Sequence, residues 1–99
     1  MHMHDTATYR VRGRVVVRTI GTDTLLVPVS GPPAGARVYP VNATALAVWN
    51  CLSEGGTVCR AAAALTECFA VPSAEQALAD SAACARTFVA ESLLEAVNP

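Results

Sequence analysis

The spacing of apolar residues changes once along this 99-residue chain, at Asn42. Before Asn42, apolar residues gather in short runs rich in Val and Leu. After it, they recur every three or four positions. The first pattern is typical of strands and the second of amphipathic helices. Strands followed by helices in separate parts of one chain predict an α+β fold.

Three strands are expected before the change. Residues 14–20 and 24–29 are β-rich, and Gly21-Thr22-Asp23 between them predicts a hairpin. Pro28 lacks an N–H and therefore belongs at a sheet edge or a strand end. A stiff turn at residues 30–35 leads to a third strand at about residues 37–41, in which Pro40 removes one ladder donor.

Three helices are expected after the change. The first begins at Asn42 or Thr44 and ends at residues 55–56, which are both glycine. Its apolar face consists of Ala45, Val48, Trp49 and Leu52.

Thr57 is a good cap for the second helix, which Pro72 ends. Residues 73–76 form a capping box that opens the third helix, with Ser73 bonding forward and Gln76 reaching back. The third helix ends near Leu94. The prediction is therefore a three-stranded antiparallel sheet followed by three helices, an arrangement of winged helix-turn-helix type.

The length predicts one domain, which we place at residues 10–94. Residues 1–9 are expected to form a flexible arm and residues 95–99 a frayed tail. With 53% apolar residues, the chain can build a core without disulfides or metal. No apolar run is long enough to span a bilayer and no secretion signal is visible, so a cytoplasmic protein is expected.

The cysteines are Cys51, Cys59, Cys68 and Cys84. Their spacing fits no common zinc pattern, so we interpret them as small hydrophobic residues of a reduced helical core and expect no metal site. Both histidines lie in the arm, no Ser-His-Asp or Cys-His set is available inside the domain, and no phosphate-binding loop is present. The sequence therefore predicts a protein that is not an enzyme and that binds no cofactor.

Residues 38–49 carry a resemblance to a known family. They read V-Y-P-V-N-A-T-A-L-A-V-W, which is similar to the V-Y-x-L-N-x-T-A-x-x-I-W segment of the PqqD-like peptide chaperones, also called RiPP recognition elements. Further matching residues are Leu52, Gly56, Thr57, Val58, Leu65, Phe69, Leu93 and Leu94. Two positions depart from the family pattern: Cys84-Ala85 replace a usual Phe-Leu, and Ser92 replaces a usual Gly. The third helix is therefore expected to leave a shallower or roomier groove.

In PqqD-like domains the leader of a precursor peptide lies between the third strand and the last helix. The resemblance therefore implies a peptide-binding site on the strand residues Val38, Tyr39, Pro40 and Val41. It implies a helix side formed by Ala83, Arg86, Thr87 and Ala90. Arg86 is expected to pair with a leader carboxylate.

An extended peptide can add to a free strand edge through main-chain hydrogen bonds. The residues also allow a simpler interpretation. Tyr39 and Val41 alternate in phase, so they can serve the core, and Pro40 can protect the edge against strand addition. Both interpretations of this strand are open at the level of the sequence.

The resemblance implies a chaperone that binds the leader of a ribosomally made precursor and presents it to a modifying enzyme, often a radical SAM enzyme. The edge strand and the Pro/Gly-rich loop are compatible with a monomer or with a domain-swapped dimer. The alternatives are a winged-helix DNA-binding protein and a non-catalytic accessory subunit. DNA binding is disfavoured because residues 57–94 hold two Arg and four acidic residues, a net charge of −2.

Overall fold

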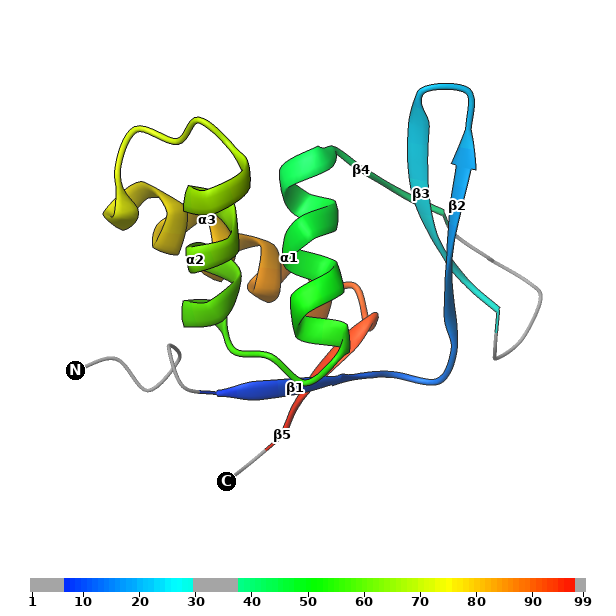
Figure 1. The fold of residues 1–99 in the computed structure, drawn as a ribbon. Coiled ribbons are helices and arrows are strands. Elements are labelled where there is room, and N and C mark those ends of the chain that lie inside the picture. The colour runs from blue at the N-terminus through cyan, green and yellow to red at the C-terminus, as the bar shows by residue number, and fades with distance from the viewer. Residues whose placement is uncertain (1–6, 30–37, 98–99) are drawn as a thin grey trace.

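The structure is a computed structural model that describes residues 7–29 and 38–97. Its strands are β1 (Thr8–Val11), β2 (Val15–Ile20), β3 (Asp23–Pro28), β4 (Tyr39–Val41) and β5 (Leu94–Val97). Its helices are α1 (Ala43–Ser53), α2 (Val58–Cys68) and α3 (Ala74–Ala90). In Figure 1 the β2–β3 hairpin stands to one side of the helices, and β4 runs from it to the start of α1.

The predicted sheet is present. Strands β2, β3 and β4 form an antiparallel sheet in that order, and the three helices follow it in the chain. The α+β class is therefore confirmed. The expected turn at residues 30–35 and the start of the third strand at residue 37 lie outside the described residues.

Two predicted boundaries are wrong. The end of the expected N-terminal arm forms β1, and most of the expected frayed tail forms β5. The two strands pair antiparallel, with Tyr9 opposite Ala96 and Arg10 opposite Glu95. An ion pair also joins the side chains of Arg10 and Glu95. Tyr9 is buried in the core, which explains why residues 8–11 form a strand.

The helix caps follow from local chemistry. The Asn42 side chain accepts a hydrogen bond from the Ala45 N–H at 2.8 Å, so Asn42 and not Thr44 caps α1. Ser73 accepts from the Gln76 N–H at 3.0 Å and caps α3 as expected. The second half of the predicted capping box is wrong, because the Gln76 side chain donates forward to Asp80 at 2.8 Å.

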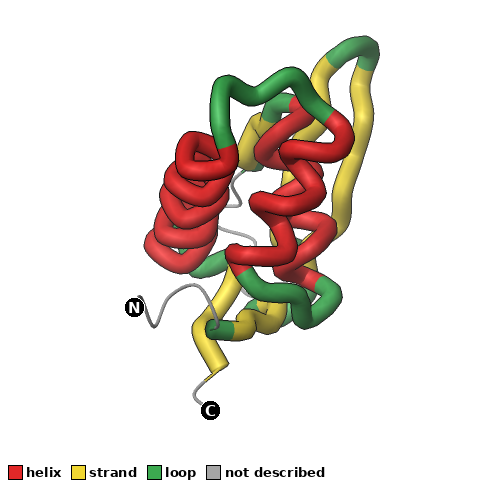
Figure 2. The backbone as a smooth tube through the Cα atoms, turned by 60° about the vertical axis from the view of Figure 1, so that its left-hand side comes forward, coloured by secondary structure: helices red, strands yellow, loops and turns green. Residues whose placement is uncertain are grey.

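The core lies between the helices and extends to the three-stranded sheet, where Val15, Tyr39 and Val41 are half-buried against it. Leu26 in β3 is fully buried. The ring of Trp49 on α1 meets the ring of Phe88 on α3 edge to face, with 5.3 Å between the centroids and 79° between the planes. Pairs of this geometry stabilise a fold by about 0.5–1.5 kcal/mol beyond the area they bury. Figure 2 shows the three helices as one group with the hairpin rising beside them.

One backbone hydrogen bond at the end of the hairpin shows which residue pairs of the sheet are hydrogen-bonded to each other. The Val29 N–H donates to the Arg14 C=O at 2.9 Å, in register with the β2–β3 ladder. Bonded and non-bonded pairs alternate in an antiparallel ladder. The bonded pairs are therefore Val16–Val27, Arg18–Leu25 and Ile20–Asp23. The intervening residues of β2 and β3 turn their N–H and C=O groups away from each other.

The turn after α3 contains the one non-glycine residue with a positive φ in the described chain. Ser92 has φ = +63°, a conformation that costs an L-residue about 1–2 kcal/mol and a glycine almost nothing. The usual Gly of the PqqD-like pattern therefore has a physical reason at this position, and Ser92 departs from it.

We expect Ser92→Gly to raise the free energy of unfolding by about 1 kcal/mol, because glycine relieves the left-handed strain. Chemical denaturation measures this change. Ala82→Gly, in the interior of α3, is the control and should lower stability by about 1 kcal/mol or more. Destabilisation by both substitutions would contradict the strain at Ser92.

Candidate functional site

Strand β4 has a free edge, because no described strand other than β3 pairs with it. Bonded and non-bonded pairs alternate along β2 and β3, so the backbone N–H and C=O groups of Thr24 and Leu26 point towards β4. There they lie opposite Val41 and Tyr39. The backbone groups of Tyr39 and Val41 therefore form hydrogen bonds with β3, and the backbone C=O of Pro40 points to the free edge. At its centre the free edge thus offers one C=O group and no N–H.

An apolar groove lies between β4 and α3. It encloses about 170 Å³ and its lining is almost entirely apolar; we call it the β4–α3 groove. Its lining residues are Tyr39, Pro40, Val41, Ala45, Cys84, Thr87, Phe88, Glu91 and Leu93. Complete burial of one apolar side chain there would contribute about 1.5–3 kcal/mol to binding.

The structure brings together half of the eight residues expected at the site. Tyr39, Pro40, Val41 and Thr87 all line the β4–α3 groove. Val38 directly precedes β4 and has 54% of its surface exposed.

Three expected helix residues do not line the groove. Ala83 and Ala90 are exposed on α3 one turn to either side of Thr87, so they lie next to the groove. Arg86 is also exposed, but it faces another neighbour. Its positive charge acts on the phenol of Tyr9, where it partly offsets the rise in pKa that burial causes.

Sequence reasoning missed the residues that form most of the helix side of the groove. Cys84, Phe88 and Glu91 lie three or four positions from Thr87 or from each other, which puts them on one face of α3. This period was available in the sequence. The contribution of Leu93 was not, because it depends on the turn at Ser92 that brings the chain back beneath α3.

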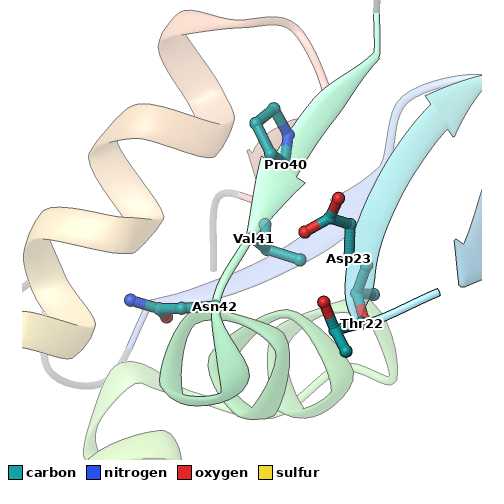
Figure 3. A pocket seen from close by; sticks show the side chains of 6 residues that line it. Thr22, Asp23, Pro40, Val41 and Asn42 are labelled. Atoms are coloured by element: carbon teal, nitrogen blue, oxygen red, sulfur yellow. The ribbon is translucent and has the colours of Figure 1, made fainter. Parts of the chain in front are cut away.

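A second, more polar hollow lies at the far end of β4 (Figure 3). It encloses about 360 Å³ and is lined by Thr22, Asp23, Thr24, Pro40, Val41 and Asn42. The Asp23 carboxylate points towards Val41 in Figure 3. The Oδ1 atom of Asn42 already accepts from the Ala45 N–H and the Thr44 hydroxyl. Asp23 is the one ionisable residue in the lining of this hollow.

The cysteines divide into two pairs. Cys59 and Cys68 are exposed, so their interpretation as core residues is wrong. Cys51 and Cys84 are half-buried. Burial raises the pKa of the Cys84 thiol, and the negative charge of Asp80 raises this pKa further. Burial also raises the pKa of Cys51. Both groups are therefore weak nucleophiles at neutral pH.

Neither a metal-ligand cluster nor a membrane-spanning helix is present among the described residues. No group of three or more His, Cys, Asp or Glu side chains in residues 7–29 and 38–97 could hold a metal ion. None of the helices there is long and apolar enough to cross a membrane.

Comparison with known proteins places the groove in a family context. The sequence profile of the family described as coenzyme PQQ synthesis protein D (PqqD) matches residues 29–94. The chain belongs to the PqqD family. The match spans β4, all three helices and the Ser92 turn, and therefore the whole lining of the groove. No curated protein and no solved structure matches the chain. PqqD proteins bind a precursor peptide and work with the enzymes of PQQ synthesis.

The exposure of the thiols gives a direct test of the groove geometry. Alkylation by iodoacetamide at about pH 8 should label Cys59 and Cys68 first and Cys84 and Cys51 more slowly. Because their pKa values are raised, the slow pair should gain reactivity as the pH rises and more thiolate forms. Mass spectrometry of the digested protein resolves the four sites. Labelling of Cys84 as fast as Cys59 would show that the groove is open to solvent.

Proposed function

We propose that this protein binds the leader of a ribosomally made precursor peptide as an extended strand in the β4–α3 groove. It then presents the precursor to a peptide-modifying enzyme, for which a radical SAM enzyme is the leading candidate. The observation that carries the proposal is an apolar groove with a free strand edge on one side and a helix on the other. Membership of a peptide-binding family supports it.

The edge alone cannot provide the affinity. A net backbone hydrogen bond contributes about 1 kcal/mol, and a micromolar complex needs about 8 kcal/mol. Pro40 donates no bond, and the Asn42 C=O already accepts from Leu46 in α1. Side chains of the leader must therefore fill the groove against Tyr39 and Phe88, so the backbone sets direction and register while apolar burial supplies most of the binding energy.

The remaining expected residues take secondary roles in this proposal. Val38 and the small side chains of Ala83 and Ala90 border the groove and leave room for a peptide along α3. Arg86, whose charge lowers the pKa of Tyr9, attracts an acidic leader over a longer range.

The protein itself carries out no chemistry in this proposal. It acts by tethering, because a bound leader raises the effective concentration of the rest of the precursor at the enzyme's active site. The iron–sulfur clusters of a radical SAM enzyme would belong to the partner. The proposed place of action is the cytoplasm, where precursor peptides are made.

The deciding experiment is a backbone-amide NMR titration with the leader peptide encoded beside this gene. We expect salt-tolerant binding, with the largest shifts in residues 38–41 and on the Cys84–Thr87 side of α3. Thr87→Arg should weaken binding about tenfold by filling the groove, the equivalent of 1.4 kcal/mol. Ala79→Arg adds the same charge to an exposed part of the same helix and should leave affinity unchanged.

The same titration with duplex DNA tests the main alternative. Shifts confined to residues 10–18 and the helices, lost steeply with added salt, would replace the peptide site by a nucleic-acid interface. Equal weakening of leader binding by Thr87→Arg and Ala79→Arg would place the peptide outside the groove.

Pro40 provides a second test. Pro40→Ala restores an N–H at the centre of the free edge without changing the inward bonds of Tyr39 and Val41. One added hydrogen bond should tighten leader binding about fivefold, which corresponds to 1 kcal/mol. Isothermal titration calorimetry measures the change. An unchanged affinity would show that the leader forms no strand pair at this position.

A further inference from the structure

The sheet has a second free edge, which the peptide site does not use. Strand β2 is the other outer strand, and none of the described strands except β3 pairs with it. The bonded pairs of the hairpin occupy Val16, Arg18 and Ile20. The residues Val15, Val17 and Thr19 therefore point their N–H and C=O groups away from the sheet.

This edge is better suited to strand addition than the edge of β4. β2 is six residues long and contains no proline, whereas β4 is three residues long with Pro40 at its centre. All three outward residues of β2 have an N–H as well as a C=O. Val17 is 41% exposed and Ile20 is 66% exposed, so apolar side chains accompany the unpaired backbone.

Soluble proteins usually protect such an edge with proline, a bulge or charged side chains, and the one charged side chain of β2 is that of Arg18. β2 lacks a proline, and its ladder with β3 runs without a break from Val15 to Ile20, so it contains no bulge. An exposed, apolar and regular edge strand of this kind is a ready template for another strand.

The charge of the edge specifies what kind of strand fits. Arg18 is the one ionisable residue of β2 and forms no ion pair with a described residue. It lies between two outward-bonding residues, so a residue of an added strand would sit directly opposite it in a close, non-bonded pair. An acidic side chain there would be stabilised and a basic one repelled.

We propose that the β2 edge docks an exposed strand of a protein partner that places an Asp or Glu opposite Arg18, between β-branched residues opposite Val16 and Ile20. A second copy of this chain is a poorer occupant, because two β2 strands would bring two copies of Arg18 onto the same face. The site lies at the opposite edge of the sheet from β4, so it does not depend on the peptide-binding proposal.

The test uses two synthetic hexapeptides as probes, Val-Thr-Glu-Val-Ile-Thr and the same sequence with Lys in place of Glu. Backbone-amide NMR of the full chain should show shifts at Val15, Val17 and Thr19 with the Glu peptide. The Glu peptide should bind at least about threefold more tightly than the Lys peptide. Arg18→Glu should reverse that preference.

Two variants isolate the backbone contribution. Val17→Pro removes the central outward N–H, does not break the β2–β3 ladder and should abolish binding of both peptides. Val17→Thr keeps the N–H and should bind normally. If Val17→Pro unfolds the hairpin, which its own spectrum would reveal, the reversal by Arg18→Glu still decides the proposal.

Three results would overturn the inference. They are equal affinity of the Glu and Lys peptides, an unchanged preference in Arg18→Glu, and shifts at Val15, Val17 and Thr19 that grow with protein concentration in the absence of peptide. The last result would identify a second copy of the chain as the occupant. A failure at β2 leaves the β4–α3 groove untouched, because leader binding is read from different amides.

Discussion

The contact between Trp49 on α1 and Phe88 on α3 determines where α3 stands relative to the sheet. One residue, Asn42, separates the end of β4 from the start of α1, so its cap ties the position of the helix to that strand. Phe88 meets Trp49 in the core and also lines the β4–α3 groove. The width of the groove is therefore tied to core packing, because a movement of α3 away from β4 would disturb the contact between Trp49 and Phe88.

Part of this architecture is readable from local chemistry. The hairpin, the third strand and the start of α1 follow from patterns a few residues long, such as β-rich runs and a capping Asn42. The β1–β5 ladder does not, because each strand has only four residues and its partner lies at the other end of the chain. Neither strand is identifiable until the helices between them have packed and brought Tyr9 into the core.

The candidate site divides in the same way. Its strand side could be predicted, since Tyr39, Pro40 and Val41 are adjacent in sequence and form one edge. The helix residues expected at the site differ from those that line the groove, which include Cys84 and Phe88 but not Arg86. A resemblance indicates which helix faces the peptide, but the rotation of that helix depends on which side chains it buries. The helix pattern around Phe88 contained that information, whereas Arg86 was expected at the site because of the family resemblance and its charge.

The alternation of hydrogen-bonded and non-bonded pairs in the sheet determines which backbone groups each free edge offers to a ligand. The bond between the Val29 N–H and the Arg14 C=O, together with the β3–β4 register, shows that the backbone of Pro40 faces the free edge of β4, while the outward residues of β2 keep every donor. The edge beside the groove is thus poor in hydrogen bonds and rich in apolar surface, so a ligand there must be selected by its side chains. The opposite edge is rich in hydrogen bonds and has one charge, so it selects by strand geometry and by the residue opposite Arg18. A shift of β4 by one residue against β3 would turn Pro40 inwards and leave Tyr39 and Val41 with outward N–H groups, so the register of β4 specifies what the edge beside the groove can accept.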